Sequence, residues 1–413
     1  MAEGERQVMV DALRAVALLG IVVVNVAAYR RGVGPNLAAG GGRVGGQVDA
    51  LTVGLSALTE GRFYPLFSFL FGWGFAVQDA RSRVRGRSVV GPWLRRCGVL
   101  LVLGVAHAVL LFDGDILTTY AVLAVGLLLV RPLRPGWLVA LGAGLILVQS
   151  LFSTALVALA TWASAAGDGG AAGVRADTVR ELAADARVYG DGSFFEVAGA
   201  RLSDLALYPL GLLSVGGTVL GMMVLGVAAA RGGWVDLRRW PAWLRTGIVP
   251  LWLVGLALSV PAAWLLGDTA LGARSVGRGA LMWSAYSLLG PAMALLWAGV
   301  VLRAGDVGAL RRVLTAIAPA GRMSLTVYLS QSLIGSLLFN GYGLDLGDRL
   351  GIGASVVLMI GVWAVQVVLA VLWFRAFTMG PLEALTRGAA YLAWPSVRRR
   401  GAGSPLAPPG APG

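Results

Sequence analysis

Long stretches without a charged side chain recur along this sequence and restrict its fold more than any other feature. About ten of them occur, at residues 15–29, 63–78, 97–112, 116–130, 136–167, 205–230, 246–267, 279–302, 323–344 and 351–374. Charged residues make up only 13% of the chain and the mean hydropathy is +0.76, whereas soluble domains carry about 25% charged residues. The sequence therefore predicts an all-α, polytopic transmembrane bundle of about ten spanning helices.

The predicted spans differ in length. The last six are long enough for a hydrocarbon core of about 30 Å, whereas the first four have only about 15 residues, or about 24 Å at 1.5 Å per residue. We expect these four helices to be short and the turn Asp113-Gly114-Asp115, between the third and fourth, to lie below the outer surface of the membrane. Short spans with charged ends are where we expect the chemistry.

The arginines predict the orientation of the bundle. With the N-terminus inside, most of the 34 basic residues fall on the cytoplasmic side, in clusters such as residues 81–96, 231–245 and 303–322. We therefore expect both termini to be cytoplasmic, in a bacterial cytoplasmic membrane. The same rule accounts for the net charge of +13, so the lipid bilayer is the expected partner and nucleic acid is not.

Residues 1–397 are predicted to form a single membrane domain with one insertion. The insertion, residues 168–204, lies on the outer face, where Thr178 and Glu181 have the spacing of a capping box ahead of a short amphipathic helix. Residues 398–413 are rich in Pro, Gly and Ala and are expected to form a disordered cytoplasmic tail. Gly217 and Gly221 form a GxxxG pair that predicts close helix packing.

Few residues of this chain can support metal or redox chemistry. The sequence has one cysteine and one histidine. This excludes an intramolecular disulfide framework, a cysteine metal cluster and a multi-histidine zinc site. We therefore predict no metal site and no permanently bound cofactor.

The first predicted helix carries polar residues on one face. Asp11 and Arg14 are three residues apart and Asn25 lies two heptads beyond Asp11, so all three project near the same side. Ionisable groups inside a membrane are costly unless they are paired or in a wet cavity. Asp11 and Arg14 are therefore candidates for catalysis and Asn25 for substrate binding. An ion pair that orients the helix at the inner interface is the equally weighted alternative.

The only histidine, His107, precedes the turn Asp113-Gly114-Asp115 between the third and fourth predicted spans. An imidazole near the middle of a membrane is a natural proton acceptor or nucleophile, because no other side chain here has an ordinary pKa near neutrality. His107 and Asp115 are therefore predicted to be catalytic, and Asp113 to contact substrate. A histidine that only hydrogen-bonds between helices is the alternative.

Two further groups complete the candidate site. In the ninth span, Tyr328 and Gln331 belong to a polar stripe, with Arg322 beside it. The stripe predicts a cavity lining and substrate contacts, although interhelical hydrogen bonds explain it equally well. Arg95 and Arg96 precede the third span and would meet the phosphates of an anionic co-substrate at the cytoplasmic mouth. The positive-inside rule alone also accounts for these two arginines.

Six stretches of the sequence stand out, in this order: DALRAVALLGIVVVNV, GRFYPLFSFLFGWGFAV, RRCGVLLVLGVAHAVLLFDGDILTTYA, YGDGSFFEVAGARLSD, GRMSLTVYLSQSLIGSLLFNGYGLDL and GPLEALTRG. Together they resemble the bacterial membrane family called domain of unknown function 418, the YeiB-like proteins. The resemblance extends nearly from end to end. The chain departs from the family pattern at Val10, Ala15 and Val327, where the family usually has Leu, Gly and Asn, so no amide role carries over to Val327.

The opening stretch is also similar to that of acyltransferase family 3 proteins and, more distantly, of the heparan-glucosaminide acetyltransferases. These membrane enzymes move an acyl group from cytoplasmic acyl-coenzyme A to an acceptor, often a sugar. The resemblance implies a transmembrane acyltransferase with acyl-coenzyme A as co-substrate and a small hydroxyl or amine acceptor, with His107 as general base or acyl carrier. A small-solute transporter, indicated by polar residues inside the spans, and a membrane protein without catalysis are the alternatives.

Overall fold

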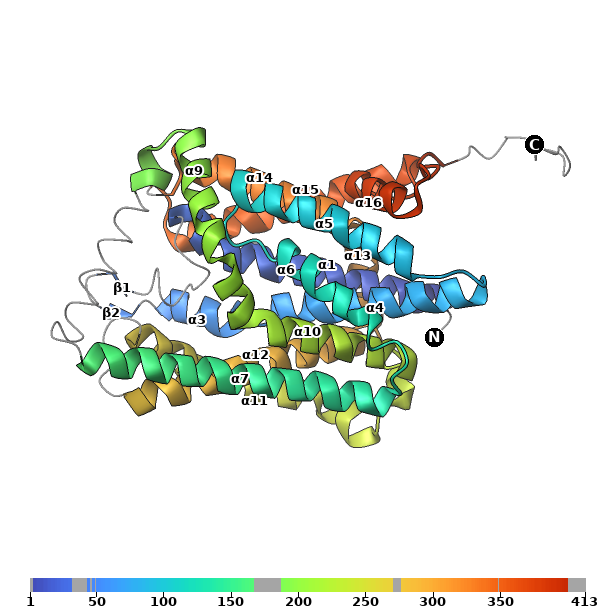
Figure 1. Cartoon of the computed structure of the whole chain (residues 1–413), viewed down its shortest axis with the longest axis horizontal. Coiled ribbons are helices and arrows are strands. Elements are labelled where there is room, and N and C mark those ends of the chain that lie inside the picture. The colour runs from blue at the N-terminus through green and yellow to red at the C-terminus, as the bar shows by residue number, and fades with distance from the viewer. Residues whose placement is uncertain are drawn as a thin grey trace, which may run out of the picture.

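The structure is a computed structural model of the chain, and it describes residues 3–31, 43–44, 47–48, 50–166, 187–269, 276–347 and 349–399. Within these ranges the fold is helical except for a two-stranded antiparallel hairpin of β1 (Arg43–Val44) and β2 (Gln47–Val48). The hairpin pairs Arg43 with Val48 and Val44 with Gln47. Most of the helices lie side by side along the longest axis of the molecule (Figure 1).

Helices of very different length follow one another along the chain. The α-helices are α1 (Glu3–Arg31), α3 (Ala50–Thr59), α4 (Phe63–Val84), α5 (Val90–Leu110), α6 (Leu117–Leu123), α7 (Pro135–Ala166), α9 (Phe194–Asp204), α10 (Tyr208–Gly232), α11 (Ala242–Thr269), α12 (Val276–Ala304), α13 (Gly308–Arg322), α14 (Ser324–Phe339), α15 (Ile352–Ala376) and α16 (Pro381–Tyr391). The 3-10 helices are η1 (Ala124–Leu128), η2 (Leu205–Leu207) and η3 (Leu237–Arg239).

Helix α1 lies at the centre of the bundle. Its side chains at Leu13, Leu18 and Val22 are 2% exposed or less, and it contacts α3, α4, α13, α14 and α15. Within the most apolar 18-residue stretch of α1, 67% of the residues are buried, whereas the corresponding values for α7 and α11 are only 28% and 17%. Large apolar side chains such as Leu147 and Val254 are exposed on these outer helices. This is the arrangement of a bundle whose outer surface faces lipid.

Seven helices among the described residues are long and apolar enough to cross a membrane. They are α1, α5, α7, α9 joined to α10, α11, α12 and α15. Two further apolar helices, Leu117–Leu128 and Ser324–Phe339, are shorter, and α4 has 22 residues with Asp79 and arginines near its end. The helices are those of a multi-pass membrane protein, and the count of ten spans stays a prediction.

The expected shortness of the first four spans is wrong for three of them. Helix α1 has 29 residues, α4 has 22 and α5 has 21. Each continues past its apolar stretch into charged residues, because arginine and glutamate are good helix formers. Only the segment of α6 and η1 is short, with 7 and 5 residues. Helices α3, α13 and α16 lie in segments where the apolar pattern predicted only connections.

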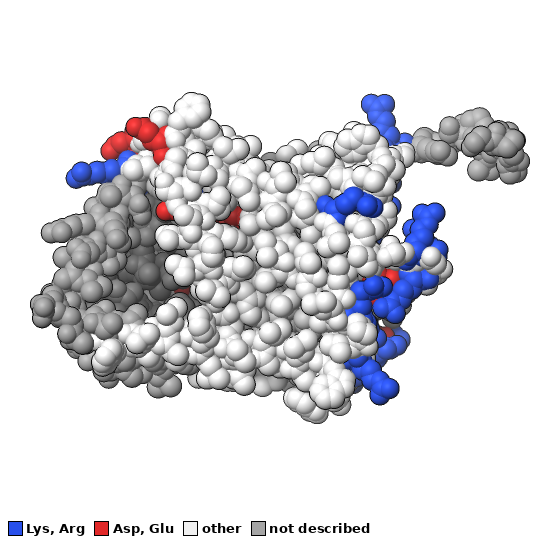
Figure 2. All heavy atoms as spheres, in the orientation of Figure 1, with Lys and Arg blue, Asp and Glu red and all other residues white. Residues whose placement is uncertain are grey.

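Both ends of the described chain lie at one end of the bundle. Helix α1 begins there and α16 lies there as well (Figure 1). Most arginines visible in Figure 2 gather at the same end, whereas acidic residues gather at the opposite end, near α9. We call the first of these the arginine-rich end; the exposed residues Arg85 and Arg87, which follow α4, belong to it. A membrane protein with both termini on one side shows this separation of charge.

Small residues bring α10 against α7. A Cβ atom at Gly217 would lie 2.8 Å from Gln149, and one at Gly221 would lie 2.7 Å from the carbonyl oxygen of Gly142. Real Cβ atoms do not approach other atoms so closely, so the GxxxG pair marks close packing as predicted. Gln149 Nε2 also donates to the carbonyl oxygen of Ser214 at 2.9 Å, which fixes the contact between the two helices.

The predicted insertion and tail are described only in part. The capping box predicted at Thr178 and Glu181 lies outside the described residues, whereas another one begins α9. There the Ser193 N–H and hydroxyl both donate to Glu196 Oε2 at 2.7 Å. The tail pairs at its start with the end of α15, where Arg399 N donates to the Ala376 carbonyl oxygen at 2.9 Å. Residues 400–413 lie outside the described part.

Candidate functional site

His107 and Asp115 meet at the turn between α5 and α6. The His107 Nδ1 atom lies 2.8 Å from Asp115 Oδ1, and both side chains are 1% exposed or less. His107 is in the last turn of α5, where its carbonyl oxygen accepts the backbone N–H groups of Leu111 and Phe112. In Figure 1 this turn lies well inside the end of the bundle that carries α9. The pair is therefore buried within the protein.

The partners of Asp115 determine which nitrogen of His107 is free. The Asp115 carboxylate accepts the backbone N–H groups of Leu117 at 3.1 Å and Thr118 at 2.7 Å, at the start of α6. Because an ionised carboxylate can only accept hydrogen bonds, His107 Nδ1 is the donor of the third. In the neutral imidazole, Nε2 then keeps its lone pair. This atom is buried and has no hydrogen-bond partner among the described residues.

Gly104 allows α6 to come close enough for this contact. A Cβ atom at Gly104 would lie 2.5 Å from Thr118 Oγ1 and 2.6 Å from Thr118 N, so a larger residue would push the start of α6 away. Gly104 precedes His107 by nearly one turn of α5, and Thr118 is one of the residues that Asp115 holds. Gly104 is therefore part of what positions Asp115 on His107.

The predicted polar stripe of α14 reaches the pair at Tyr328. The Tyr328 and His107 rings lie 5.0 Å apart, centroid to centroid. Gln331, nearly one turn further along α14, is 1% exposed, and neither polar atom of its amide has a partner in the described part of the chain. Ser332 and Tyr29 of α1 form a hydrogen bond between their hydroxyls at 3.1 Å. Interhelical bonding therefore explains Ser332 but not Gln331.

Tyr328 also lines a cavity of about 100 Å³. Leu117, whose backbone N–H binds Asp115, lines it as well. The remaining wall is mainly apolar and includes Leu18, Ile21, Phe67, Phe71 and Leu100. His107 itself does not line the cavity. Tyr328, Leu117 and Ile116, which directly follows Asp115, connect the cavity to the buried pair.

Arg96 provides a positive charge in this cavity. It precedes His107 by eleven residues on α5, or about 16 Å toward the arginine-rich end. Its guanidinium lies 5.5 Å from the ring centres of Phe71 and Trp93. The neighbouring Arg95 instead donates from Nε to the carbonyl oxygen of Ala390 at 2.8 Å, at the end of α16. Of the two predicted arginines, Arg96 is thus the one inside the cavity.

Glu383 is a cavity residue that sequence reasoning missed. It lies in the first turn of α16 and lines the same cavity as Arg96. Its Oε1 atom accepts the backbone N–H groups of Leu325 at 2.7 Å and Thr326 at 3.2 Å, at the start of α14. Glu383 therefore fixes the helix that carries Tyr328. The stretch GPLEALTRG, noted for its resemblance, was the only sequence signal for it.

The predicted pair in α1 forms but does not line this cavity. Arg14 Nη1 donates to Asp11 Oδ1 at 2.7 Å. Asp11, Arg14, His107 and Gln331 were all predicted to belong to one candidate site. None of these four residues lines the cavity beside Tyr328 or the larger cavity at the arginine-rich end. The described cavities therefore do not bring the four together.

Arg322 and Asn25, two other residues predicted to contact substrate, lie near other residues of the protein and away from the described cavities. Arg322 is exposed, donates from Nη2 to the carbonyl oxygen of Thr378 at 2.6 Å, and lies over the Phe374 ring at 4.5 Å. It therefore ties the end of α13 to the connection between α15 and α16. Asn25 lies on α1 next to Tyr29, one turn away. Neither residue lines a described cavity.

Asp113 lies on the α9 side of the same turn, near Arg201. Arg201 is 4% exposed and donates from Nη1 to the carbonyl oxygen of Leu110 at 3.3 Å, at the end of α5. Burial raises the pKa of Asp113 to about 6, and the charge of Arg201 counteracts part of this shift. Sequence reasoning missed Arg201 because 91 residues separate it from Leu110.

A second buried carboxylate, Asp79, was also missed. It is 3% exposed and lies in α4. Its oxygens lie 2.9 Å from Arg83, 2.8 Å from Arg131 and 3.9 Å from Arg231. This cluster ties α4 to the connection before α7 and to the end of α10. Because all its partners are guanidinium groups, which do not exchange protons near neutral pH, we regard the cluster as structural.

Metal binding finds no support in the part of the chain that the structure describes. There, no three His, Cys, Asp or Glu side chains lie close enough together to hold a metal ion. Cys97 is buried in an apolar cluster that joins α5, through Trp93, to Phe75 of α4, and there it has the surroundings of a packing residue.

Curated bacterial proteins are similar to this chain over most of its length. A family profile described as "Protein of unknown function (DUF418)" matches residues 229–393. The uncharacterized protein YxaH of Bacillus subtilis (strain 168) is 32% identical over 346 residues, covering 81% of this chain and 80% of that protein. The uncharacterized protein YeiB of Escherichia coli (strain K12) is 30% identical over 415 residues, covering 93% and 96%. No solved structure gives a significant match.

Proposed function

The chain belongs to the DUF418 family of bacterial proteins, and from that premise we propose that it is a plasma-membrane acyltransferase. In this proposal the arginine-rich end faces the cytoplasm, by the positive-inside rule. Acyl-coenzyme A enters there, and a small hydroxyl or amine acceptor, such as a sugar or a secondary metabolite, approaches from the opposite side. The observation that carries the proposal is the buried Nε2 atom of His107, which has no partner among the described residues.

His107 has the surroundings of a general base. Asp115 holds Nδ1 at 2.8 Å, and two backbone N–H groups hold Asp115 in turn. This arrangement fixes the ring and its tautomer, as a carboxylate does for the histidine of serine hydrolases. A histidine that only connects helices would use both ring nitrogens, because an unpaired buried acceptor is costly. The free Nε2 therefore favours a chemical role.

The proposed reaction balances without a further reactant. His107 Nε2 takes the proton of the acceptor hydroxyl while its oxygen attacks the thioester carbonyl carbon. The new oxygen–carbon bond forms, and the carbon–sulfur bond of the tetrahedral intermediate then breaks. His107 returns the proton to the coenzyme A sulfur, which leaves as a thiol. Between the two steps, the Asp115 carboxylate stabilises the imidazolium.

The cavity beside Tyr328 supports the direction from which the donor arrives. Its apolar wall suits an acyl group or the arm that carries it, and Arg96 lies on the side nearer the arginine-rich end. A guanidinium is a favourable partner for phosphate oxygens. The volume of about 100 Å³ is small, which favours a short acyl chain over a fatty acyl chain. We therefore propose acetyl-coenzyme A or a similar short donor.

Thermal unfolding of the detergent-purified protein tests the donor site. We expect acetyl-coenzyme A to raise the unfolding midpoint of the wild type, because a ligand that binds only the folded state stabilises it. Arg96→Gln should reduce this rise, whereas Arg85→Gln, an exposed arginine at the same end, should keep it. No rise with millimolar acetyl-coenzyme A would contradict the proposal. Solute uptake into proteoliposomes without acyl-coenzyme A would instead indicate a transporter.

A further inference from the structure

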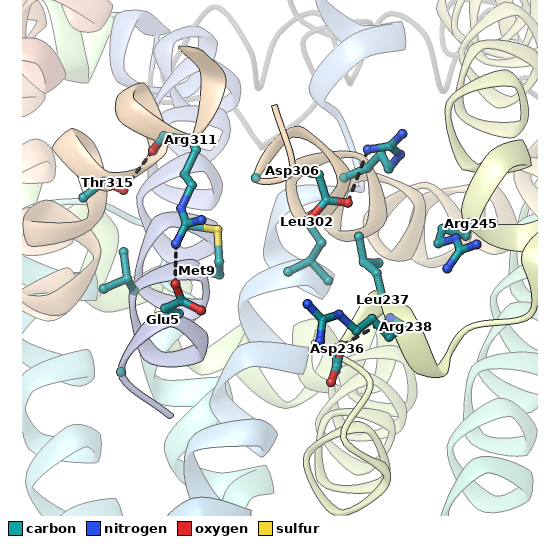
Figure 3. A pocket seen from close by; sticks show the side chains of 14 residues that line it. Glu5, Met9, Asp236, Leu237, Arg238, Arg245, Leu302, Asp306, Arg311 and Thr315 are labelled. Carbon is teal, nitrogen blue, oxygen red and sulfur yellow. Dashed lines mark hydrogen bonds and ion pairs between the residues drawn. The ribbon is translucent and has the colours of Figure 1, made fainter. Parts of the chain in front are cut away.

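A larger cavity opens at the arginine-rich end and is formed by other parts of the chain. Its volume is about 710 Å³. The walls come from the start of α1, from η3 and α11, and from the connection between α12 and α13 (Figure 3). It shares no lining residue with the cavity beside Tyr328. Small-molecule sites typically have volumes of about 300–1,000 Å³, so this cavity is large enough for one.

Two acidic residues of this cavity are paired with two of its arginines. Glu5 of α1 lies 2.6 Å from Arg311 of α13, and Asp306 lies 3.2 Å from Arg303 at the end of α12. Figure 3 shows these two ion pairs on neighbouring parts of the wall. The lining holds two other arginines and one other acidic residue, Asp236, so its net charge is positive by one.

Arg238 and Arg245 are those other arginines. Both are exposed, and among the described residues neither guanidinium has an ion pair or a hydrogen bond. The nearby Asp236 accepts the backbone N–H of Arg238 at 3.2 Å and so caps η3 instead. In Figure 3, Arg238 and Arg245 lie across the cavity from Glu5. The cavity thus presents two unpaired cations to whatever enters it.

The floor of the cavity is apolar. Met9, Leu237 and Leu302 line it and are 5%, 6% and 7% exposed. Arginines placed for the positive-inside rule need only face water, whereas these converge from separate segments above an apolar floor. Guanidinium groups suit phosphate oxygens, and the floor suits an apolar or aromatic body. The combination indicates a ligand that carries both a phosphate group and an apolar or aromatic part.

We propose that this cavity binds a phosphate-bearing ligand. Arg238 and Arg245 hold the phosphate, and the apolar part of the ligand rests on Met9, Leu237 and Leu302. The phosphate comes from an anionic phospholipid headgroup or from a soluble nucleotide-like molecule. Binding here does not depend on acyl transfer at His107, so the two proposals can fail separately.

Binding to the full-length, purified protein tests this site. The probes are inorganic phosphate, coenzyme A and phosphatidylglycerol in nanodiscs, with phosphatidylcholine nanodiscs as the lipid reference. The test variant is Arg238→Gln with Arg245→Gln. The matched control is Arg85→Gln with Arg87→Gln, which removes the same charge at the same end from exposed residues that line neither cavity.

We expect at least one probe to raise the unfolding midpoint of the wild type and of the control. The dissociation constant for that probe should rise tenfold or more in the test variant, because charge-assisted hydrogen bonds are lost. Stabilisation by phosphatidylglycerol alone assigns the site to lipid; stabilisation by coenzyme A or phosphate that Arg96→Gln does not change assigns it to a soluble ligand. The proposal is overturned if no probe stabilises the wild type, or if both double variants lose binding equally.

Discussion

Two buried aspartates of this molecule have opposite surroundings. Asp79 is held by arginine side chains, with Arg83 and Arg131 within 2.9 Å. Asp115 is held by two backbone N–H groups and by the imidazole of His107. Every side-chain partner of Asp79 is a permanent cation, whereas the partner of Asp115 keeps a basic nitrogen. Burial and charge pairing are common to both aspartates; what distinguishes Asp115 is the Nε2 atom of its partner His107, which has no hydrogen-bond partner among the described residues and which we propose to be reactive.

The largest expected effect is on activity, and it distinguishes the His107–Asp115 pair from the arginine cluster around Asp79. His107→Gln should lower acyl transfer by about 10²- to 10⁴-fold, the usual contribution of a general base. Its thermal midpoint should stay close to that of the wild type, since Asp115 keeps its two backbone donors. Initial rates at equal amounts of folded protein measure this. Equal rates for His107→Gln and the wild type would show that the His107–Asp115 pair, like the Asp79 cluster, has no role in the reaction.

The next effect is on stability, and it concerns the arginine cluster around Asp79. Asp79→Asn should lower the free energy of unfolding by about 3 kcal/mol, because removing one partner leaves nearby charges uncompensated. The activity of each folded molecule should remain. Thermal or denaturant unfolding of detergent-purified protein, followed by a rate measurement on the folded fraction, gives both values. A stable but inactive Asp79→Asn protein would show that Asp79 takes part in the reaction and is not only structural.

A smaller effect tests how Asp115 is positioned. Gly104→Ala should displace the start of α6, since the added Cβ would lie 2.5 Å from Thr118 Oγ1. Overpacking of this kind typically costs about 1–3 kcal/mol, and a misplaced base lowers the rate as well. Gly98→Ala is the matched control, because a Cβ at Gly98 of the same helix meets nothing within 4 Å. Equal behaviour of the two variants would show that close packing at Gly104 is unimportant.

The smallest effect concerns pH. Burial raises the pKa of Asp113 from 3.8 to about 6, so the folded state binds its proton more tightly than the unfolded state does. Stability should therefore fall as pH rises from about 4 to about 6, by about 1 kcal/mol or less because Asp113 is partly exposed and near Arg201. Asp113→Asn should flatten this part of the profile. Unfolding midpoints between pH 4 and 7 measure it, and identical slopes would contradict the assignment.

Sequence reasoning succeeds where partners are close along the chain. Asp11 and Arg14 are three residues apart, and His107 and Asp115 are separated only by the end of one helix and a turn. Helical periodicity and a turn-forming glycine are enough to bring such residues together. The all-helical fold and the close packing at Gly217 follow equally from local patterns.

The same reasoning fails where partners are far apart along the chain or where a helix extends beyond its apolar stretch. Glu383 holds Leu325 from 58 residues away, and Arg131 holds Asp79 from 52 residues away. No local pattern contains these contacts. Hydropathy reports which solvent a segment prefers and not where its hydrogen bonds end, so it missed the charged beginning of α1 at Glu3.

The central claim is that His107 Nε2 is the base of an acyl transfer supplied from the arginine-rich end. Release of the coenzyme A thiol from acetyl-coenzyme A tests it most directly, with wild-type, His107→Gln and Asp79→Asn protein in proteoliposomes and a panel of sugar acceptors. We predict acceptor-dependent release by the wild type and by folded Asp79→Asn, and its loss in His107→Gln. Release that His107→Gln retains, or no release by the wild type with any acceptor, would contradict the claim.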